Sequence, residues 1–348
     1  MDYIALGCMS GTSLDGIDLS LIRSDGETYS EEILNYFQPY SKELKNQLHT
    51  IIKQGYMLDP KITIQLSKEY SQAIQQFLNS HKHKVDVIGL HGQTLFHDEK
   101  TKISIQLFDK KLNLDKSIPV ICNFRKNDLL NGGFGAPIIP VYHQIIYKTL
   151  QKDNAVFVNI GGVTNITIIN KNEIVAGDTS FGNALINDFI KIKYNFEMDE
   201  DGVISSKGKV NDSIVELLLK DKFFLRSLPK TLDRNYFHHY LNKLQSMDSI
   251  ENIINSLLEI IPMCIQRLVS DNNAAYILCG GGRKNLTLQN LFRKHFKNVH
   301  SIDEFDLDGD YIESQGMALL AIRYLLKKQS TYPSTTGVQK EIYLGEKC

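Results

Sequence analysis

The order of apolar and polar residues divides the chain into two similar series of strands and helices. The first series is expected to contain three strands, two helices and a short buried strand, at about 3–8, 17–23, 29–37, 41–53, 60–80 and 85–90. The second is expected to contain three strands, two helices and an apolar strand, at about 155–160, 165–169, 173–176, 183–192, 248–270 and 275–279. A last helix is expected at about 312–328. A β-β-β-α-β order is therefore predicted to occur twice.

The length of the chain favours two domains. Its 348 residues exceed one ordinary core and suit two domains of roughly 150 residues each. The boundary is expected near Pro119, because proline interrupts strand pairing and the segment before it is rich in Lys and Asp. We therefore expect an α/β protein with domains at 1–120 and 121–348 and a cleft between them. The last helix and the tail are expected to be able to pack back on the first domain.

Charge and composition narrow the range of partners. Lys and Arg number 39 and Asp and Glu number 40, so the net charge of -1 provides no basic field for nucleic acid. No apolar run reaches the length of a membrane span, and the first residues lack the pattern of a secretory signal, so a cytoplasmic location is expected. The five cysteines form no C-x-x-C pair and are expected to be reduced, mostly buried thiols.

A polar turn between the first two predicted strands is the first candidate for ligand binding. Glycine permits positive φ and a close approach of the backbone to phosphate, and hydroxyl side chains add donors. A simple hairpin is the alternative on these residues alone. The turn consists of Gly11, Thr12, Ser13, Leu14, Asp15, Gly16, Ile17 and Asp18.

Two more glycine-rich turns follow apolar strands in the second half. Gly161 and Gly162, with Asn165 shortly after them, either relieve crowding or bind a ligand. The triplet Gly280, Gly281 and Gly282 leaves no side chains between the backbone and whatever lies above it. A nucleotide base or ribose fits there better than a flexible turn does, since consecutive glycines cost conformational entropy.

Asp178 lies between a predicted strand and a predicted helix, among small residues. A carboxylate at a strand end can act as a general base if it reaches the proton it abstracts. On spacing alone, however, the commoner use of Asp178 or Thr179 is as an N-cap of the following helix.

The remaining polar clusters have simpler interpretations. His91 and His97 lack the spacing and partners of a zinc site, so a substrate-contacting loop or a structural histidine fits better. An amphipathic helix is expected from Asp233 to Leu244, with His238 and His239 at its surface. The charged runs 191–201 and 303–310 are expected to be solvated loops.

Taken together, the segments resemble the anhydro-N-acetylmuramic acid kinases, a bacterial family of the actin-like ATPase superfamily. The resemblance spans nearly the whole chain and rests on blocks in a fixed order. These are Met9–Asp18, His91–Thr94, Asn123–Arg125, Gly132–Pro137, Pro140, His143-Gln144, Asn159–Gly162, Asn165, Asp201-Gly202 and Cys279–Gly282.

The resemblance implies a two-domain actin-like (ribonuclease H-like) fold and a defined reaction. ATP-dependent opening of the 1,6-anhydro ring of anhydro-N-acetylmuramic acid would place phosphate on O6 and water at C1, in peptidoglycan recycling. Asp178 would be the base that activates the water, which reverses the preference for capping. The first turn would hold the ATP phosphates, and Asp15 and Asp18 would hold hydrated Mg²⁺. His91, Gln93 and Glu313 would contact the sugar, and a homodimer is implied.

Two positions depart from the family pattern. The family usually continues from the catalytic aspartate as Thr-Gly-Pro, whereas this chain has Ser180 and Phe181 after Thr179. Asn123 stands where the family more often has an acidic residue. Two alternatives therefore stay open: a kinase of this fold that acts on another sugar or on a carboxylic acid, and an ATP-binding regulator without catalysis.

Overall fold

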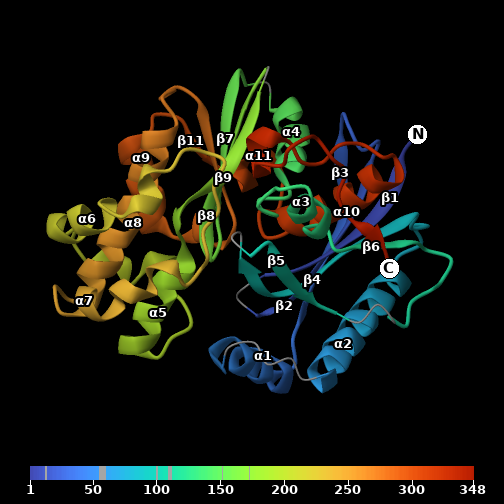
Figure 1. Ribbon diagram of the computed structural model, residues 1–348, viewed down its shortest axis with the longest axis horizontal. Helices are drawn as coiled ribbons and strands as arrows, with labels where there is room; N and C mark the ends of the chain where they lie inside the picture. The colour runs from blue at the N-terminus through green and yellow to red at the C-terminus, as the bar shows by residue number, and fades with distance from the viewer. Residues whose placement is uncertain (12–13, 55–59, 99–100, 109–111, 151, 172) are drawn as a thin grey trace. The chain divides into compact units, whose positions relative to one another are not determined.

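The computed structural model describes residues 1–11, 14–54, 60–98, 101–108, 112–150, 152–171 and 173–348, which form two compact units (Figure 1). Unit 1 comprises Met1–Leu150 and Tyr311–Cys348, and unit 2 comprises Gln151–Asp310. The boundary expected near Pro119 falls inside unit 1, because the strand that follows it pairs with the sheet of that unit. The last helix and the tail belong to unit 1, as the sequence allowed.

Unit 1 is built on a mixed sheet in the order β12-β6-β4-β1-β2-β3, with β5 paired to β4. β1, β2 and β3 are antiparallel neighbours, while β4 runs parallel to β1 and β6 parallel to β4. The tail strand β12 is antiparallel to β6. The strands are β1 (Tyr3–Ser10), β2 (Gly16–Ser24), β3 (Ser30–Pro39), β4 (Val87–Asp98), β5 (Ile103–Leu107), β6 (Val120–Cys122) and β12 (Glu346–Lys347).

Helices pack on both faces of this sheet. Leu6 and Cys8 of β1 belong to the core beneath α1 and α2, whereas Gly7 between them faces α10. A Cβ added to Gly7 would lie 1.8 Å from the Ser314 carbonyl oxygen, so glycine is needed for this close approach. The helices of unit 1 are α1 (Lys42–Gln54), α2 (Pro60–Asn79), α3 (Lys126–Leu130), α4 (Pro140–Thr149), α10 (Ile312–Leu325) and α11 (Pro333–Thr336).

Unit 2 repeats the arrangement of unit 1. Its sheet has the order β11-β10-β7-β8-β9, in which β7, β8 and β9 are antiparallel, β10 is parallel to β7, and β11 is parallel to β10. The duplication predicted from the apolar pattern is thus confirmed at the level of topology. The strands are β7 (Asn154–Ile160), β8 (Val163–Asn170), β9 (Ile174–Phe181), β10 (Ala275–Cys279) and β11 (Val299–Ser301).

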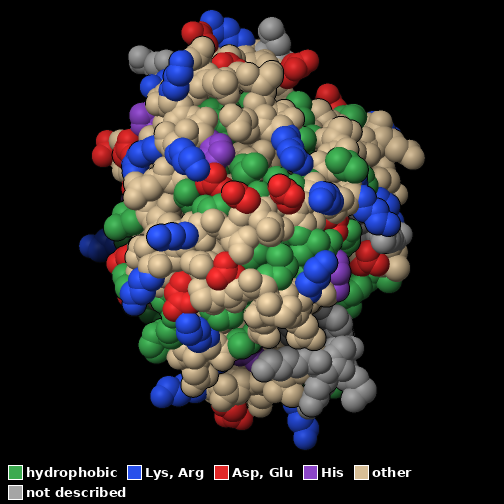
Figure 2. All heavy atoms as spheres, turned by 90° about the vertical axis from the view of Figure 1, so that its left-hand side faces the viewer, with side chains coloured by type: hydrophobic (Ala, Val, Ile, Leu, Met, Phe, Trp, Pro, Cys, Tyr) green, Lys and Arg blue, Asp and Glu red, His purple; other side chains and the backbone are tan. Residues whose placement is uncertain are grey.

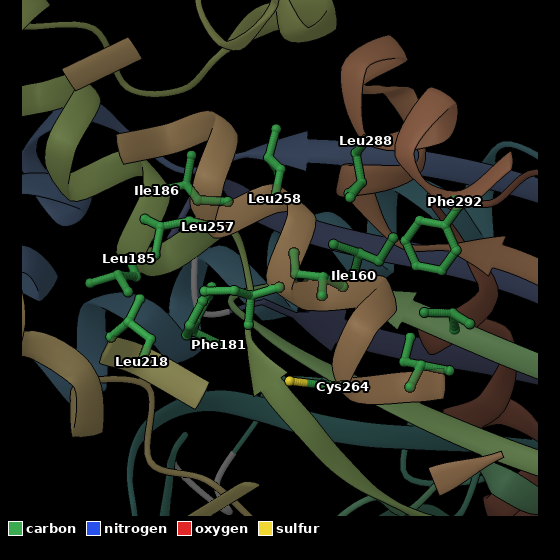
Figure 3. Packing of buried hydrophobic residues seen from close by; sticks show 14 of the residues in the cluster. Ile160, Phe181, Leu185, Ile186, Leu218, Leu257, Leu258, Cys264, Leu288 and Phe292 are labelled. Carbon is green, nitrogen blue, oxygen red and sulfur yellow. The ribbon is translucent and has the colours of Figure 1, made fainter. Parts of the chain in front are cut away.

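The core of unit 2 lies between this sheet and its helices, as Figure 3 shows for Ile160, Leu257 and Phe292. The helices are α5 (Asn183–Tyr194), α6 (Asp212–Leu219), α7 (Leu241–Gln245), α8 (Ile250–Leu268) and α9 (Leu286–His295). The single helix expected from Asp233 to Leu244 is instead a 3₁₀ turn at Tyr236–Tyr240 followed by the short α7.

The cysteines correct one expectation. Cys122 of β6 forms a disulfide with Cys348, with their Cα atoms 6.1 Å apart, because the pairing of β12 with β6 brings the tail beside this strand. Cys8, Cys264 and Cys279 are free and buried, as expected. Scattered spacing in the sequence gave no sign of a bond that joins residues 226 positions apart.

Basic and acidic side chains are interspersed on the face shown in Figure 2, with no extended region of one sign. Among the described residues, none of the helices combines the length and the apolar character needed to cross a lipid bilayer.

Candidate functional site

The first glycine turn lies between β1 and β2, and its last residues, Gly16 to Asp18, belong to β2. β2 already begins at Gly16, and Asp18 is paired with Met9 across the two strands. Leu14 adopts a left-handed conformation with φ 60°, and its N–H donates to the Gly11 carbonyl at 3.4 Å. Because β1 and β2 are antiparallel neighbours, the chain reverses direction between them.

The side chains of this turn divide into buried and outward positions. Leu14 and Ile17 are at most 1% exposed and belong to the core of unit 1. Any ligand contact at these two residues therefore comes from the backbone. The hydroxyl residues Thr12 and Ser13 lie outside the described residues.

A buried polar network supports the turn from below. The Gln93 side-chain amide donates to the Gly11 carbonyl at 3.0 Å, and the Tyr40 hydroxyl lies 3.1 Å from Gln93 Oε1 and 2.8 Å from Ser10 Oγ. The Tyr70 hydroxyl also bonds to Ser10 Oγ. Burial raises the pKa of both tyrosines, so both stay protonated. Gln93, expected as a sugar contact, thus holds the glycine turn in place.

Of the candidate magnesium ligands, Asp15 lies just before β2 and Asp18 lies within it. Asp15 Oδ1 accepts from Lys45 Nζ at 2.7 Å, and both side chains are partly exposed. Within the described ranges, no group of three or more His, Cys, Asp or Glu residues is arranged to hold a metal. Mg²⁺ beside these residues would therefore be held mainly by water and phosphate oxygens and not by a cage of protein ligands.

His91 is a buried part of β4 and not of a loop. Arg125 Nε donates to His91 Nε2 at 3.1 Å, and His91 Nδ1 lies 2.9 Å from the Gly92 carbonyl. Burial and the nearby Arg125 charge lower the pKa of His91 to about 3, so the ring is neutral and carries its proton on Nδ1. Arg125 Nη1 also donates to the Gly135 carbonyl at 2.8 Å. His91 therefore orients Arg125, a residue to which the sequence reasoning gave no role.

Asp128 shapes the glycine-rich loop that follows Arg125. Its carboxylate is fully buried and accepts from the Gly135 N–H at 2.7 Å and the Thr336 hydroxyl at 2.6 Å. A Cβ on Gly133 would lie 2.0 Å from Asp128 Oδ2, which explains why this position is a glycine.

Glu313, the third expected sugar contact, lies partly buried in the first turn of α10.

The glycine turn of unit 2 is tied to the helix that follows β9. The Gly161 carbonyl accepts from the Asn183 N–H at 2.8 Å, and the Gly162 carbonyl accepts from the N–H groups of Gly182 and Ala184, both at 3.2 Å. These bonds satisfy amides at the start of α5 that have no partner within the helix. The turn therefore has a structural function, whatever ligand it binds.

The glycine triplet after β10 contains two packed positions and one open one. A Cβ on Gly280, which has φ 72°, would lie 2.4 Å from Asn159 Oδ1, and a Cβ on Gly282 would lie 2.3 Å from Ile160 Cγ2. A Cβ on Gly281 would meet nothing within 4 Å. Of the three glycines, Gly281 is the one that leaves room for a ligand to approach the backbone.

Arg283 fixes the triplet to a neighbouring loop. Its nearly buried guanidinium donates to Asp303 at 2.8 and 3.0 Å, to Asp310 at 2.6 Å and to the Gly280 carbonyl at 3.2 Å. Despite the desolvation that opposes it, the bond to Arg283 holds the pKa of Asp303 well below its usual range. The run 303–310 lies largely at the surface, as expected, although it begins with a 3₁₀ turn, and Asp303 and Asp310 also neutralise the nearly buried Arg283.

Asp178 is part of β9 and is held by backbone groups. It is 7% exposed, lies opposite Asn165 of β8, and accepts from the Leu232 N–H at 2.7 Å through Oδ2. Its own N–H donates to the Lys230 carbonyl at 2.8 Å. The N-cap of α5 is Gly182, without a side-chain cap, so the capping interpretation does not hold.

The two residues that depart from the family pattern are part of the core. Phe181 is 2% exposed, and its ring centroid lies 5.2 Å from that of Phe237 and 6.4 Å from that of Phe224, edge to face. Figure 3 shows Phe181 among the apolar side chains of unit 2. The Ser180 hydroxyl is buried and donates to the Phe181 carbonyl at 2.9 Å. The departure thus changes how the core is filled beside Asp178.

The comparisons with known proteins agree across the whole chain. A sequence profile of the family anhydro-N-acetylmuramic acid kinase matches residues 3–348. A relative of that name from Pelagibacter ubique (strain HTCC1062) is 34% identical over 367 residues, covering 97% of this chain and 96% of the relative. Another from Rhizobium johnstonii (strain DSM 114642 / LMG 32736 / 3841) is 35% identical over 364 residues, covering 97% of each.

Among solved structures, (R)-2-hydroxyglutaryl-CoA dehydratase component A from Acidaminococcus fermentans is similar with a TM-score of 0.49 and 9% identity. The match covers 93% of this chain and 100% of that one, a similarity too low to inform function.

The duplicated mixed sheets define a two-unit α/β protein, as the resemblance implied. The chain belongs to the anhydro-N-acetylmuramic acid kinase family. It is therefore a kinase, an enzyme that transfers a phosphoryl group.

Proposed function

We propose that the protein uses ATP to open the 1,6-anhydro ring of anhydro-N-acetylmuramic acid and to phosphorylate its O6. The products are N-acetylmuramic acid 6-phosphate and ADP, which suits the recycling of peptidoglycan sugars. The observation that carries the proposal is Asp178, a buried carboxylate fixed by the Leu232 N–H at the position that matches the family's catalytic aspartate.

Asp178 serves as the general base in this reaction. It takes a proton from a water molecule, whose oxygen bonds to C1 of the sugar as the C1–O6 bond breaks. O6 then takes the γ-phosphoryl group, and ADP leaves. A fixed, buried carboxylate suits this work, because it needs no rearrangement at the moment of proton transfer.

ATP is the phosphoryl donor, and backbone groups supply much of its site. The connection between β1 and β2 is the candidate for the phosphates, and the open backbone at Gly281 suits the close approach of the nucleotide. Mg²⁺ neutralises charge on the phosphates when bound, with Asp15 and Asp18 as candidate partners through water.

The substitution Asp178→Asn tests the role of the base. It keeps the shape of the side chain and an oxygen that can accept from Leu232, but it removes the basic carboxylate. Turnover, measured as ADP formation with the anhydro sugar, should fall by about 10²–10⁴-fold. ATP binding, measured by calorimetry, should stay close to that of the unchanged protein. Asp212→Asn, at an exposed position of α6, is the matched control.

Near-normal turnover in Asp178→Asn would refute the base. A panel of other sugars and carboxylic acids, followed by the same ADP assay, tests the substrate. Activity on a different compound with none on the anhydro sugar would replace this proposal by the wider class of actin-like kinases. The burial of Phe181 supports the anhydro sugar over that alternative, because a side chain in the core does not contact the substrate directly.

A further inference from the structure

Tyr40, the residue that follows β3, contacts both ends of the connection between β1 and β2. Its N–H donates to the carbonyl of Asp15, just before β2, at 3.0 Å. Its hydroxyl lies 2.8 Å from Oγ of Ser10, the last residue of β1. Tyr40 is 6% exposed and belongs to the core of unit 1. One well-packed residue therefore fixes the end of β1 relative to the residue before β2.

The side chain of Gln93 links Tyr40 to the Gly11 carbonyl. Gln93 Nε2 lies 3.0 Å from the carbonyl oxygen of Gly11 and 3.3 Å from that of Thr94. This end of the amide must be the amino group, because carbonyl oxygens accept hydrogen bonds and cannot donate them. The other end, Oε1, lies 3.1 Å from the Tyr40 hydroxyl. An amide oxygen has no proton to give, so Tyr40 donates this bond.

The single proton of each hydroxyl then fixes the direction of the remaining bonds. Tyr40 has used its proton on Gln93, so it accepts from the Ser10 hydroxyl. Ser10 has used its own proton in turn, so it accepts from the Tyr70 hydroxyl. Burial raises the pKa of both tyrosines, so neither loses its proton. The result is a directed chain of hydrogen bonds that runs in the order Tyr70, Ser10, Tyr40, Gln93 and the Gly11 carbonyl.

This directed chain bears on phosphate binding because it ends on a carbonyl. A carbonyl oxygen carries a partial negative charge, so one that faced the phosphates of ATP would repel them. The four side chains of the directed chain are at most 6% exposed, and hydrogen bonds arranged head to tail strengthen one another. The Gly11 carbonyl is therefore held toward Gln93 by more than a single isolated bond.

We propose that Tyr40 is a positioning residue for the phosphates of ATP, which keeps the Gly11 carbonyl turned toward Gln93 through its hydroxyl. Its N–H holds Asp15 on the other side of the connection. The inference rests on the proposed function, in which the connection between β1 and β2 receives the phosphates. It does not depend on the identity of the sugar, so the binding of ATP alone can test it.

The direct test is Tyr40→Phe, which keeps the ring and the N–H but removes the proton donated to Gln93. Calorimetric titration should show that ATP binds about 3- to 10-fold more weakly, as expected for the loss of one buried hydrogen bond. Adenosine, which has no phosphate, should bind as it does to the unchanged protein. Gln93→Met removes the donor to Gly11 itself, should have the same effect, and replaces Tyr40→Phe if that variant fails to fold. Unchanged ATP affinity in the folded variants, or an equal loss for adenosine, would overturn the inference.

Two further tyrosines serve as controls. Tyr142→Phe removes another buried hydroxyl of unit 1, which donates to Gln315 Oε1 at 2.6 Å, and it should leave ATP affinity unchanged. Tyr70→Phe removes only the start of the directed chain, so it should weaken ATP binding less than Tyr40→Phe does. A loss in either control as large as that in Tyr40→Phe would show a general loosening of unit 1 and would overturn the inference.

Kinetics separate this inference from the proposed reaction. With the anhydro sugar, Tyr40→Phe should raise KM for ATP by the same factor and leave KM for the sugar unchanged, and the opposite pattern would overturn the inference. A wild-type protein that binds ATP but forms no ADP with the anhydro sugar would refute the proposed reaction, while the calorimetric comparison of ATP with adenosine would still decide on Tyr40. A wild-type protein that does not bind ATP would overturn both.

Discussion

The glycine triplet permits a sharp prediction, because its three positions differ in their surroundings. Gly281→Ala introduces a methyl group that meets no protein atom within 4 Å. The backbone of Gly281 has no positive φ, so alanine fits and should stabilise the fold by about 0.4–1 kcal/mol through the unfolded chain. If the nucleotide lies against this backbone, the same methyl group should obstruct it.

The cost to binding follows from the overlap. Inserting a methyl group into a closely packed contact costs about 1–3 kcal/mol. Since about 1.4 kcal/mol corresponds to a tenfold change in affinity, ATP should bind roughly 5- to 150-fold more weakly. Gly282→Ala, with its Cβ 2.3 Å from Ile160 Cγ2, should instead destabilise the fold.

Calorimetric titration with ATP and thermal unfolding of the free protein measure the two effects separately. The prediction is weaker binding without loss of stability in Gly281→Ala, and loss of stability in Gly282→Ala. Unchanged ATP affinity in a folded Gly281→Ala protein would refute the assignment of the triplet to the nucleotide.

Three further predictions concern stability. Cys348→Ser, or reduction of the Cys122–Cys348 bond, should lower the free energy of unfolding by about 2–4 kcal/mol. Reductant should not lower the stability of the Cys348→Ser variant any further, and if it does, loss of this disulfide is not the cause. Phe181→Ala should cost about 3–5 kcal/mol in urea unfolding, and a loss below about 1 kcal/mol would contradict its place in the core. Arg283→Met should cost about 1–3 kcal/mol at neutral pH. Because Arg283 lowers the pKa of Asp303, that loss should be full above pH about 4 and fade as the pH falls further; a difference independent of pH would refute the pairing.

Much of the fold could be predicted, because strands and long helices have a regular apolar period. The two β-β-β series, the long helices and the glycine turns at strand ends all occur near the expected positions. The domain boundary could not be placed, because β6 joins the first sheet by a pairing that no local pattern encodes. For the same reason, the sequence did not decide whether the last helix, α10, packs with the first or the second half of the chain; it belongs to unit 1.

For the candidate site, the sequence supplies motifs but not the contacts that their residues make. The sequence names His91 and Gln93 as candidates, but their partners Arg125 and Gly11 come from other segments, so these supporting contacts needed coordinates. The sequence did not predict that Lys230 is buried, since a single lysine in an irregular segment is usually exposed. Its burial depends on Phe223 and on the strand of Asp178, which are distant in sequence.

In the proposed reaction, water attacks C1 of the sugar while O6 receives the phosphoryl group. The protein should be incubated briefly with ATP, Mg²⁺ and anhydro-N-acetylmuramic acid in ¹⁸O-water, and the sugar phosphate analysed by mass spectrometry with fragmentation. Unlabelled product held in ¹⁸O-water for the same time corrects for exchange at the free C1 hydroxyl. One ¹⁸O at C1 above this control, with none in the phosphate group, is the predicted result. Sugar phosphate without enzyme-dependent label at C1, or no sugar phosphate at all, would contradict the account.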